Sequence, residues 1–208
     1  MSETTDTVFV IDDDESVRTS LRLLLNSAGL ESWTLSSARE FLETYRAEQP
    51  GCLVLDVRMP GMSGLELQRQ LNLRGAIVPV IFITGHGDVA MAVEAMRHGA
   101  FDFLQKPFRE QDLIDRIHSA LAKDLQTRAA LKERERIRRR LAFLTPRERE
   151  VLALLTRGKP NKVMAQELGV SRRTVEIHRS RIMEKCGASS LADLVRMVMD
   201  QVPPVQAG

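Results

Sequence analysis

Five polar residues of this sequence lie at or just after the end of a short apolar run. They are three carboxylates, a hydroxyl and an amine: Asp12, Asp13, Asp56, Thr84 and Lys106. Crowded carboxylates repel one another unless a cation neutralises them, and a site of oxygen ligands alone favours a hard divalent ion such as Mg²⁺ or Mn²⁺. A carboxylate beside such an ion, an amine and a hydroxyl can accept a phosphoryl group as an aspartyl phosphate. These residue types therefore predict a phosphoacceptor site.

The apolar pattern indicates how these side chains are brought together. Strand-like runs alternate with helix-like segments, the runs at 8–11, 31–35, 52–55, 78–83 and 100–104 and the segments at 16–28, 37–45, 65–73, 89–97 and from 110. This alternation predicts a doubly wound parallel α/β sheet, whose ligands bind at the carboxyl ends of the strands. We therefore expect the five polar residues at one rim of the sheet. The simpler alternative is that Asp13 and Asp56 only cap the helices that follow them, while Lys106 neutralises both.

Charge divides the chain into two parts. The chain has 208 residues and a net charge of +2, but residues 1–120 carry 18 acidic and 11 basic side chains, whereas residues 121–208 carry 10 and 19. The acidic part suits cations or phosphoryl chemistry, and the basic part suits nucleic acid. We predict a phosphoacceptor domain at 1–122, a helical linker at 123–142 and a DNA-binding domain at 143–208.

The linker is expected to be helical because neither glycine nor proline occurs between residues 108 and 145. Its sequence at 131–140, LKERERIRRR, is highly charged. Its leucines and Ile137 hold no single heptad register, so a solvated helical spacer is favoured over a dimeric coiled coil. The basic run at 138–140 could contact DNA phosphates, but a solvent-facing surface is the simpler interpretation.

The basic part contains the signals of a helix-turn-helix. Thr145 and Pro146 begin a first helix, and Asn161 is expected to cap a short second one. Gly169 then makes a turn, and Ser171 caps a longer basic helix that ends near residue 185. A fourth helix is expected at 191–199. The order of short helix, turn and basic helix predicts an all-α, four-helix domain that places its third helix in the major groove.

The acidic part resembles the receiver domain of two-component response regulators, a flavodoxin- or CheY-like (βα)5 fold, over residues 7 to about 122. The matching motifs are Asp12-Asp13, Asp56 with Met-Pro-Gly-Met-Ser-Gly at 59–64, Thr84-Gly85 and Lys106-Pro107. The resemblance implies that a sensor histidine kinase phosphorylates Asp56. It further implies that the ligands of the ion are Asp12, Asp13, Asp56 and the Arg58 carbonyl. The phosphoryl-binding and switch residues are implied to be Thr84, Lys106 and Phe103. Lys106-Pro107 is implied to be cis, and Phe103 stands where many relatives carry tyrosine.

The basic part resembles the LuxR/NarL-type helix-turn-helix over residues 140–200, and with Gly85-His86-Gly87-Asp88 the whole chain is similar to FixJ- and StyR-like regulators. That implies a transcription regulator whose phosphorylation promotes dimerisation, around residues 88–115, and binding to double-stranded promoter DNA. RNA polymerase is a further possible partner. Basic residues are expected on phosphates and Glu176, Ile177 and Ser180 on base edges. The whole DNA-binding set is Lys162, Arg172, Arg173, Thr174, Glu176, Ile177, His178, Arg179, Ser180 and Arg181.

Several other classes of protein fit poorly. Two cysteines are too few for a disulfide framework, and no apolar run approaches the roughly 18–20 residues of a membrane helix. The first ten residues carry two acids and no base, unlike a secretory signal, so a cytoplasmic protein is expected. The four histidines lack metal-ligand spacing, and no catalytic histidine is expected.

Two further functions are weighed against transcription control. A phosphohydrolase of the haloacid-dehalogenase type needs an acid/base carboxylate two residues after its nucleophile. Arg58 occupies that position, so we expect no enzyme beyond slow self-dephosphorylation. A phosphorylation-dependent adaptor whose basic domain binds RNA or protein remains open, and a gel-shift with promoter DNA distinguishes it.

Overall fold

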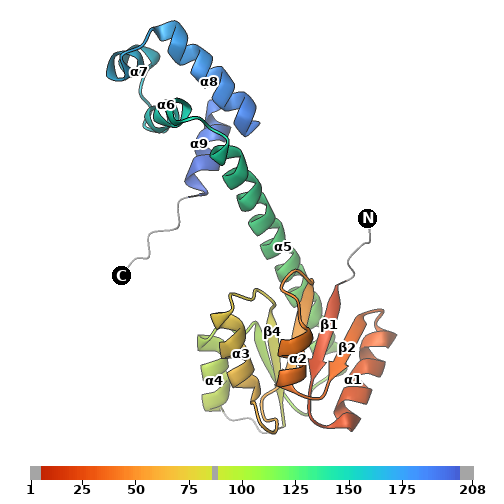
Figure 1. The fold of residues 1–208 in the computed structure, drawn as a ribbon. Helices are drawn as coiled ribbons and strands as arrows, with labels where there is room; N and C mark the ends of the chain where they lie inside the picture. The colour runs from red at the N-terminus through yellow and green to blue at the C-terminus, as the bar shows by residue number, and fades with distance from the viewer. Residues whose placement is uncertain (1–5, 86–88, 202–208) are drawn as a thin grey trace. The chain divides into compact units, whose positions relative to one another are not determined.

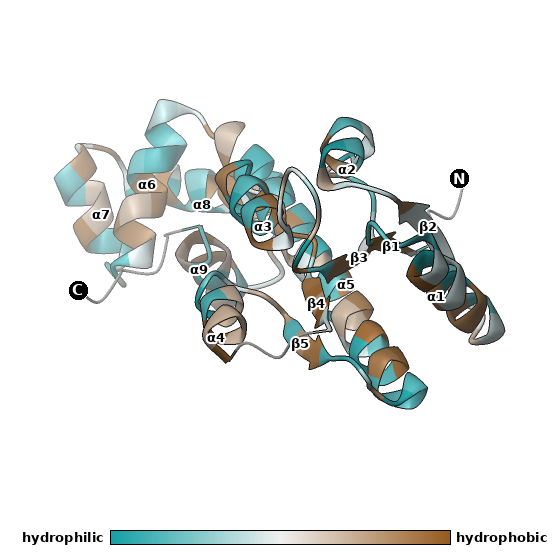
Figure 2. Ribbon diagram, turned by 90° about the horizontal axis from the view of Figure 1, so that it is seen from below, coloured by the Kyte–Doolittle hydropathy of each residue, from teal (hydrophilic) through white to brown (hydrophobic). Residues whose placement is uncertain are grey.

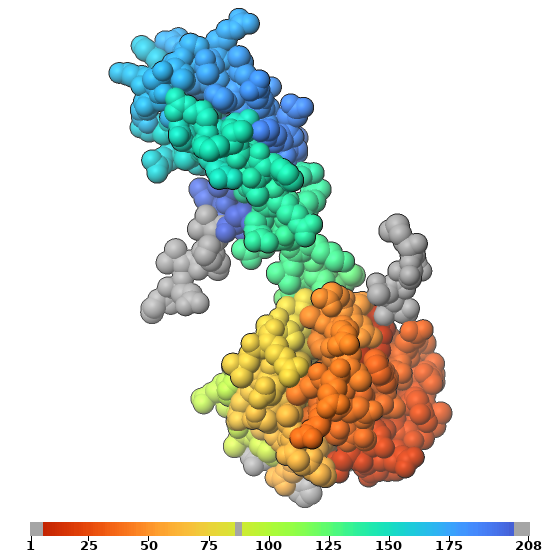
Figure 3. Space-filling view, in the orientation of Figure 1, coloured from red at the N-terminus to blue at the C-terminus, as the bar shows by residue number. Residues whose placement is uncertain are grey.

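The computed structural model describes residues 6–85 and 89–201 and divides into two units after Arg128 (Figure 1). Each unit is built around its own buried apolar residues. Figure 3 shows one face of the first unit, coloured from red to green. The division falls inside the helical linker expected at 123–142. His86, Gly87 and Asp88, part of one motif used above, lie outside the described residues.

The first unit contains a five-stranded parallel sheet in the order β2-β1-β3-β4-β5. Its strands are β1 Thr7–Ile11, β2 Glu31–Leu35, β3 Gly51–Asp56, β4 Val80–Thr84 and β5 Asp102–Gln105. Its helices are α1 Glu15–Ser27, α2 Ala38–Thr44, α3 Gly64–Leu73, α4 Val89–Arg97 and the start of α5 Glu110–Ala142. This is the doubly wound fold predicted from the alternation of apolar runs, and that prediction is confirmed.

Alternate strand residues belong to two different apolar cores. Figure 2 shows helices on both faces of the sheet. Phe9 and Leu53 belong to a core that α2, α3 and α4 cover. Val8 and Val54 belong to a second core, which α1 and α5 cover. Every residue of β3 is buried, as expected of a central strand covered on both faces. The strand that ends at Asp56 is therefore held rigidly from both sides.

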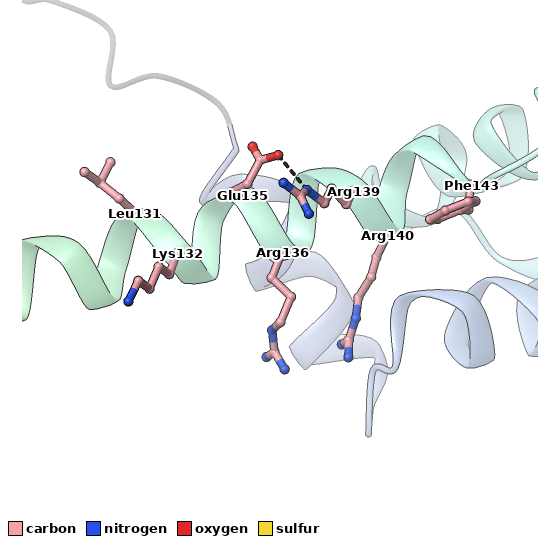
Figure 4. Close-up of a pocket in the computed structure, with 7 residues that line it drawn as sticks. All are labelled: Leu131, Lys132, Glu135, Arg136, Arg139, Arg140 and Phe143. Atoms are coloured by element: carbon pink, nitrogen blue, oxygen red, sulfur yellow. Dashed lines mark hydrogen bonds and ion pairs between the residues drawn. The ribbon is translucent and has the colours of Figure 1, made fainter. Parts of the chain in front are cut away.

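The predicted linker helix is confirmed, because α5 runs unbroken from Glu110 to Ala142. The expectation that it is simply solvated is wrong for one face, because Ile137 is only 5% exposed. Phe143, just after the end of the helix, is 77% exposed, and Figure 4 shows it with Leu131 and with the Glu135–Arg139 ion pair of 2.8 Å. The high charge of the segment 131–140 concealed this buried position.

The second unit packs four helices behind the end of α5: α6 Pro146–Thr156, α7 Asn161–Leu168, α8 Arg172–Cys186 and α9 Leu191–Met199. The four-helix prediction is confirmed. Thr145 caps α6 in a capping box, and Ser171 caps α8. The cap predicted for α7 is wrong: Pro160 occupies the cap position and Asn161 is the first helical residue. Among the described helices, none combines the length and apolarity that a membrane span requires.

A buried ion pair reinforces the start of α6. The Glu148 carboxylate accepts hydrogen bonds from the Thr145 backbone N–H at 2.8 Å and from Lys185 Nζ at 2.7 Å. The bond from Lys185, followed by that from Thr145, lowers the pKa of Glu148 from its ordinary 4.5 to about 2. The ionised carboxylate therefore belongs to the folded state and links α6 to α8.

The Glu148→Gln variant is expected to destabilise the second unit at neutral pH and to differ less from the wild type in acid. Because folding lowers the pKa of Glu148 from 4.5 to about 2, its ionised form stabilises the fold above pH 4.5, and this contribution disappears as the pH falls towards 2. At about pH 7 the lost charged hydrogen bonds cost about 1.5–3 kcal/mol. Hydrogen exchange of α6 amides in the full chain, compared between variant and wild type at the same pH, measures the difference. An equal difference at about pH 7 and about pH 3 would contradict the assignment.

Candidate functional site

The ends of β1 and β3 bring two carboxylates together beside one amine. These strands are neighbours at the point where the strand order reverses, which is where open α/β sheets bind ligands. Lys106 Nζ lies 3.0 Å from Asp12 Oδ2 and 3.5 Å from Asp56 Oδ1. The structure therefore joins three of the five rim residues by direct ion pairs, although they come from three distant parts of the sequence.

Asp56 is held in a defined orientation by its contacts with Arg58 and Lys106. Its side chain accepts a hydrogen bond from the Arg58 N–H at 2.7 Å, and the residue is 8% exposed. Burial raises the pKa of Asp56, and the charge of Asp12 adds to the rise, while the bonds from Arg58 and Lys106 oppose it. The net result is a carboxylate whose ionised form is disfavoured, chiefly because it is buried.

Gly64 explains how α3 can begin so close to this carboxylate. A Cβ at Gly64 would lie 2.2 Å from the Asp56 carbonyl oxygen, so no larger residue fits. The Gly64 N–H donates to the Val57 carbonyl at 3.0 Å and holds the loop against β3. The motif at 59–64 contains this glycine, but its packing role was not part of the sequence interpretation.

The alternative that the rim carboxylates are only helix caps is not borne out. Asp14 caps α1, accepting from the Ser16 N–H at 2.8 Å, and Ser63 caps α3. Neither Asp13 nor Asp56 makes the corresponding bond at the N-cap. The second half of that alternative describes a real contact, because Lys106 does pair with Asp56.

Arg18 is a rim residue that the sequence interpretation missed. Its guanidinium donates to the carbonyls of Asp12 and Asp13, at 2.7 and 2.9 Å. It thereby fixes the backbone from which both carboxylates project. The only signal available in the sequence is its position one turn after the acidic triplet 12–14.

The rim can be tested for its fit to a divalent ion. Its donors are all oxygens, and the carboxylates of Asp12 and Asp56 both pair with the one amine of Lys106, so their formal charge of −2 is only half balanced by it. That chemistry fits a hard cation. Asp13 is exposed, and within residues 6–85 and 89–201 no three acidic, histidine or cysteine side chains lie close enough to form a metal group. The ion and its ligand set therefore stay predictions.

The two expected switch residues lie on adjacent strands. Thr84 is buried at the end of β4, and its carbonyl accepts from the Lys106 N–H at 2.7 Å. Phe103 on β5 is half-buried, with its ring centroid 6.4 Å from that of Phe82. The Lys106–Pro107 bond is cis, as the resemblance implied. Thr84 and Lys106 thus lie at the rim, whereas Phe103 lies two residues before the end of β5 and pairs with Phe82.

The candidate nucleic-acid interface is the exposed face of α7 and α8. Gly169 has φ of 63° and ends α7 in a left-handed turn, which glycine adopts without a steric penalty. Val175 and Ile182 point into the core of the second unit. Seven predicted contact residues are exposed: Lys162, Arg172, Arg173, Glu176, Ile177, Ser180 and Arg181. They form a mostly basic surface that can meet phosphates and base edges.

The other three predicted contact residues are half-buried and have structural surroundings. The Arg179 guanidinium donates to Asn161 Oδ1, which joins α8 to α7. The Thr174 hydroxyl bonds the Ser171 hydroxyl at 2.8 Å. His178 has a buried Nδ1 without a hydrogen-bond partner in the part of the chain described here. All ten DNA contacts stay predictions, and the side chains of Arg179 and Thr174 also help to position α8.

Comparisons with known proteins assign both units. The response regulator receiver domain matches residues 8–118, and the luxR family of bacterial regulatory proteins matches residues 142–198. The chain is 48% identical over 192 residues to the transcriptional regulatory protein FixJ of Azorhizobium caulinodans, covering 92% of this chain and 91% of that protein. It is 44% identical over 197 residues to the response regulator protein TodT of Pseudomonas putida, covering 95% and 87%.

Solved structures give the same result. A low-resolution structure of the response regulator StyR is 50% identical, with a TM-score of 0.85 over 94% of this chain and 98% of that one. Full-length FixJ from B. japonicum is 41% identical, with a TM-score of 0.59 over 94% and 97%. Both similarities extend across the two units and the helix between them.

Proposed function

Because this chain belongs to the response regulators that join a receiver domain to a LuxR-type DNA-binding domain, we propose that phosphorylation of Asp56 promotes its dimerisation and its binding to specific DNA. The family expected from the motifs is confirmed, and the chain regulates transcription in a two-component system. The phosphodonor is a sensor histidine kinase. The single observation that carries the phosphorylation step is the placement of Asp56 beside Lys106 and Asp12 at the reversal point of the sheet.

The rim residues account for phosphoryl transfer in simple terms. A carboxylate oxygen of Asp56 forms a bond to phosphorus, while the bond from phosphorus to the kinase histidine nitrogen breaks. Lys106, already 3.5 Å from Asp56 Oδ1, neutralises charge on the phosphoryl oxygens. The Thr84 hydroxyl is the donor for one of these oxygens. Asp12, Asp13, Asp56 and the Arg58 carbonyl would hold Mg²⁺ or Mn²⁺, which supplies further charge neutralisation.

The same residues favour a long-lived acyl phosphate over an enzymatic turnover. The position two residues beyond Asp56 holds Arg58 and no carboxylate that could activate water. Loss of the phosphoryl group is therefore slow self-dephosphorylation. The receiver acts as a timed switch.

Dimerisation supplies the affinity that a single helix-turn-helix lacks, because two linked modules on one duplex bind far more tightly than one. The interface is proposed over the region 88–115, where Val93 and Met96 of α4 are exposed apolar side chains. RNA polymerase is the further partner at the promoter. The cytoplasm is the expected location.

A gel-shift with promoter DNA tests this function. Purified chain treated with acetyl phosphate and Mg²⁺ should bind the duplex at least about tenfold more tightly than untreated chain, and a chelator added before acetyl phosphate should remove the difference. An RNA of the same sequence is the control, since a duplex-reading helix should not select it. Binding that is equal with and without acetyl phosphate, or equal for RNA, would overturn the proposal.

A further inference from the structure

A buried ion pair fastens α5 to the first unit at the end of the sheet away from Asp56. Asp124 is 1% exposed, and its Oδ2 accepts from the Gly51 N–H at 3.0 Å and from Arg128 Nε at 2.6 Å. The other two guanidinium nitrogens of Arg128 donate to the carbonyls of Ala47 and Gln49, at 2.7 and 2.8 Å. We call Asp124 and Arg128 the α5 clasp.

The clasp holds the phosphoacceptor strand itself. Gly51 is the first residue of β3, and Asp56 is the last. A Cβ at Gly51 would lie 2.0 Å from the Thr7 carbonyl oxygen, so only glycine fits at this position, where its N–H donates to Asp124. One strand therefore carries the phosphoryl acceptor at its carboxyl end and is bonded to α5 at its amino end.

The clasp replaces apolar packing along this stretch of α5. The last buried apolar side chain of α5 in the first unit is Leu121, whereas Leu125 is 62% exposed and Lys123 and Gln126 are exposed. From residue 122 to residue 128 the helix is attached by the polar contacts of Asp124 and Arg128. A further Asp124 oxygen, Oδ1, is buried without a hydrogen-bond partner among the described residues.

A buried, incompletely satisfied ion pair is a poor source of stability, because apolar residues of similar volume often do as well or better. The pair instead fixes the orientation of α5 against β3, because the planar guanidinium forms hydrogen bonds only in fixed directions. The helix held in this way continues without a break to Ala142, and its residue Ile137 is buried in the second unit. The clasp thus fixes α5 on the first unit, and the same helix runs on into the second.

We propose that Asp124 and Arg128 are positioning residues that hold α5 to the phosphoacceptor strand and thereby make DNA binding depend on phosphorylation. The inference rests on the proposed function. It concerns how the two activities are linked, and it assigns the clasp no part in phosphoryl transfer or in DNA contact.

The test compares Arg128→Gln and Asp124→Asn in the full-length chain. Lys123→Gln is the matched control, because it removes the same charge as Arg128→Gln from an exposed position of the same helix. Three quantities are measured: labelling of Asp56 by acetyl phosphate, hydrogen exchange of residues 122–135, and the ratio of DNA affinities with and without acetyl phosphate.

Both clasp variants should label Asp56 at a rate within about twofold of wild type, because the rim is intact. The backbone amides of α5 in these variants should exchange at least about tenfold faster. Local opening of the helix then costs less free energy, because there are no clasp bonds to break. The ratio of affinities should fall about tenfold, within the usual range of coupling between sites. Arg128→Lys keeps the positive charge but lacks the planar set of guanidinium N–H donors. It should therefore fail to restore the ratio of DNA affinities with and without acetyl phosphate.

Two outcomes would overturn the inference. Unchanged exchange in the clasp variants would mean that Asp124 and Arg128 do not hold the helix. Faster exchange with an unchanged affinity ratio would mean that the clasp is only structural. Failure of the proposed function looks different, because the wild type itself would then show no phosphorylation-dependent binding. Asp56 labelling reports that the first unit of each variant is folded.

Discussion

The Asp56→Asn variant takes up no phosphoryl group from acetyl phosphate or from a kinase, whereas the wild type forms one acid-stable, base-labile aspartyl phosphate. The amide nitrogen and oxygen of asparagine are far weaker nucleophiles than a carboxylate oxygen, and the expected loss is therefore complete rather than partial. Folding is not compromised, because burial and the charge of Asp12 already disfavour the ionised Asp56 side chain. Intact-protein mass spectrometry before and after treatment measures the added phosphoryl group.

Asp14→Asn is the matched control for this experiment. Asp14 belongs to the same rim segment but caps α1, a role that asparagine fills equally well. The control should label at the wild-type rate. Labelling of the Asp56→Asn variant at the same position and rate as wild type would refute the assignment of the acceptor, and with it the proposed switch.

The double variant Arg172→Ala, Arg173→Ala is expected to lose most of its affinity for DNA. Both side chains are exposed at the start of α8, where the free N–H groups of the helix end also favour anions. Removal of two phosphate contacts should weaken binding by about 10- to 100-fold at moderate salt. It should also lower the slope of log affinity against log salt by about 1.8, or about 0.9 for each contact.

Fluorescence anisotropy of the phosphorylated chain on labelled promoter DNA, over a series of salt concentrations, measures both effects. The double variant Arg138→Ala, Arg139→Ala is the control, because it removes an adjacent arginine pair of the same charge that is exposed on α5 and already paired with Glu135. Its salt slope should stay close to that of the wild type. Equal losses in the two double variants would mean that binding depends only on net charge, and α8 would lose its special role.

Most of the fold is predictable from short-range patterns. The apolar run before Asp56 is buried along its whole length, and Thr145 with Glu148 forms the capping box that their spacing indicates. Such features depend on residues within one strand or one helical turn, so their physical causes are contained in a few neighbouring letters of sequence. The candidate site follows for the same reason, because parallel strands deliver their carboxyl ends to one rim whatever the details of packing.

Contacts between distant residues are not predictable in this way. Asp124 bonds a strand residue 73 positions away, and Lys185 reaches Glu148 across 37 positions. Asn161 has the residue type of a helix cap but serves instead as the acceptor for Arg179. In each case the packing of the domain brought a polar side chain to a partner far away in the sequence.

The sequence by itself determined the order of strands and helices, the rim residues and the two-domain family, because these follow from periodicity, capping chemistry and motif spacing. Only the tertiary structure decided that Lys106 pairs with both Asp12 and Asp56, that Ile137 is buried within the highly charged segment 131–140, and that Asp124 joins α5 to β3. The physical reason is that burial and long-range hydrogen bonds depend on which surfaces meet. That choice is made by the packing of the whole domain and not by any one segment.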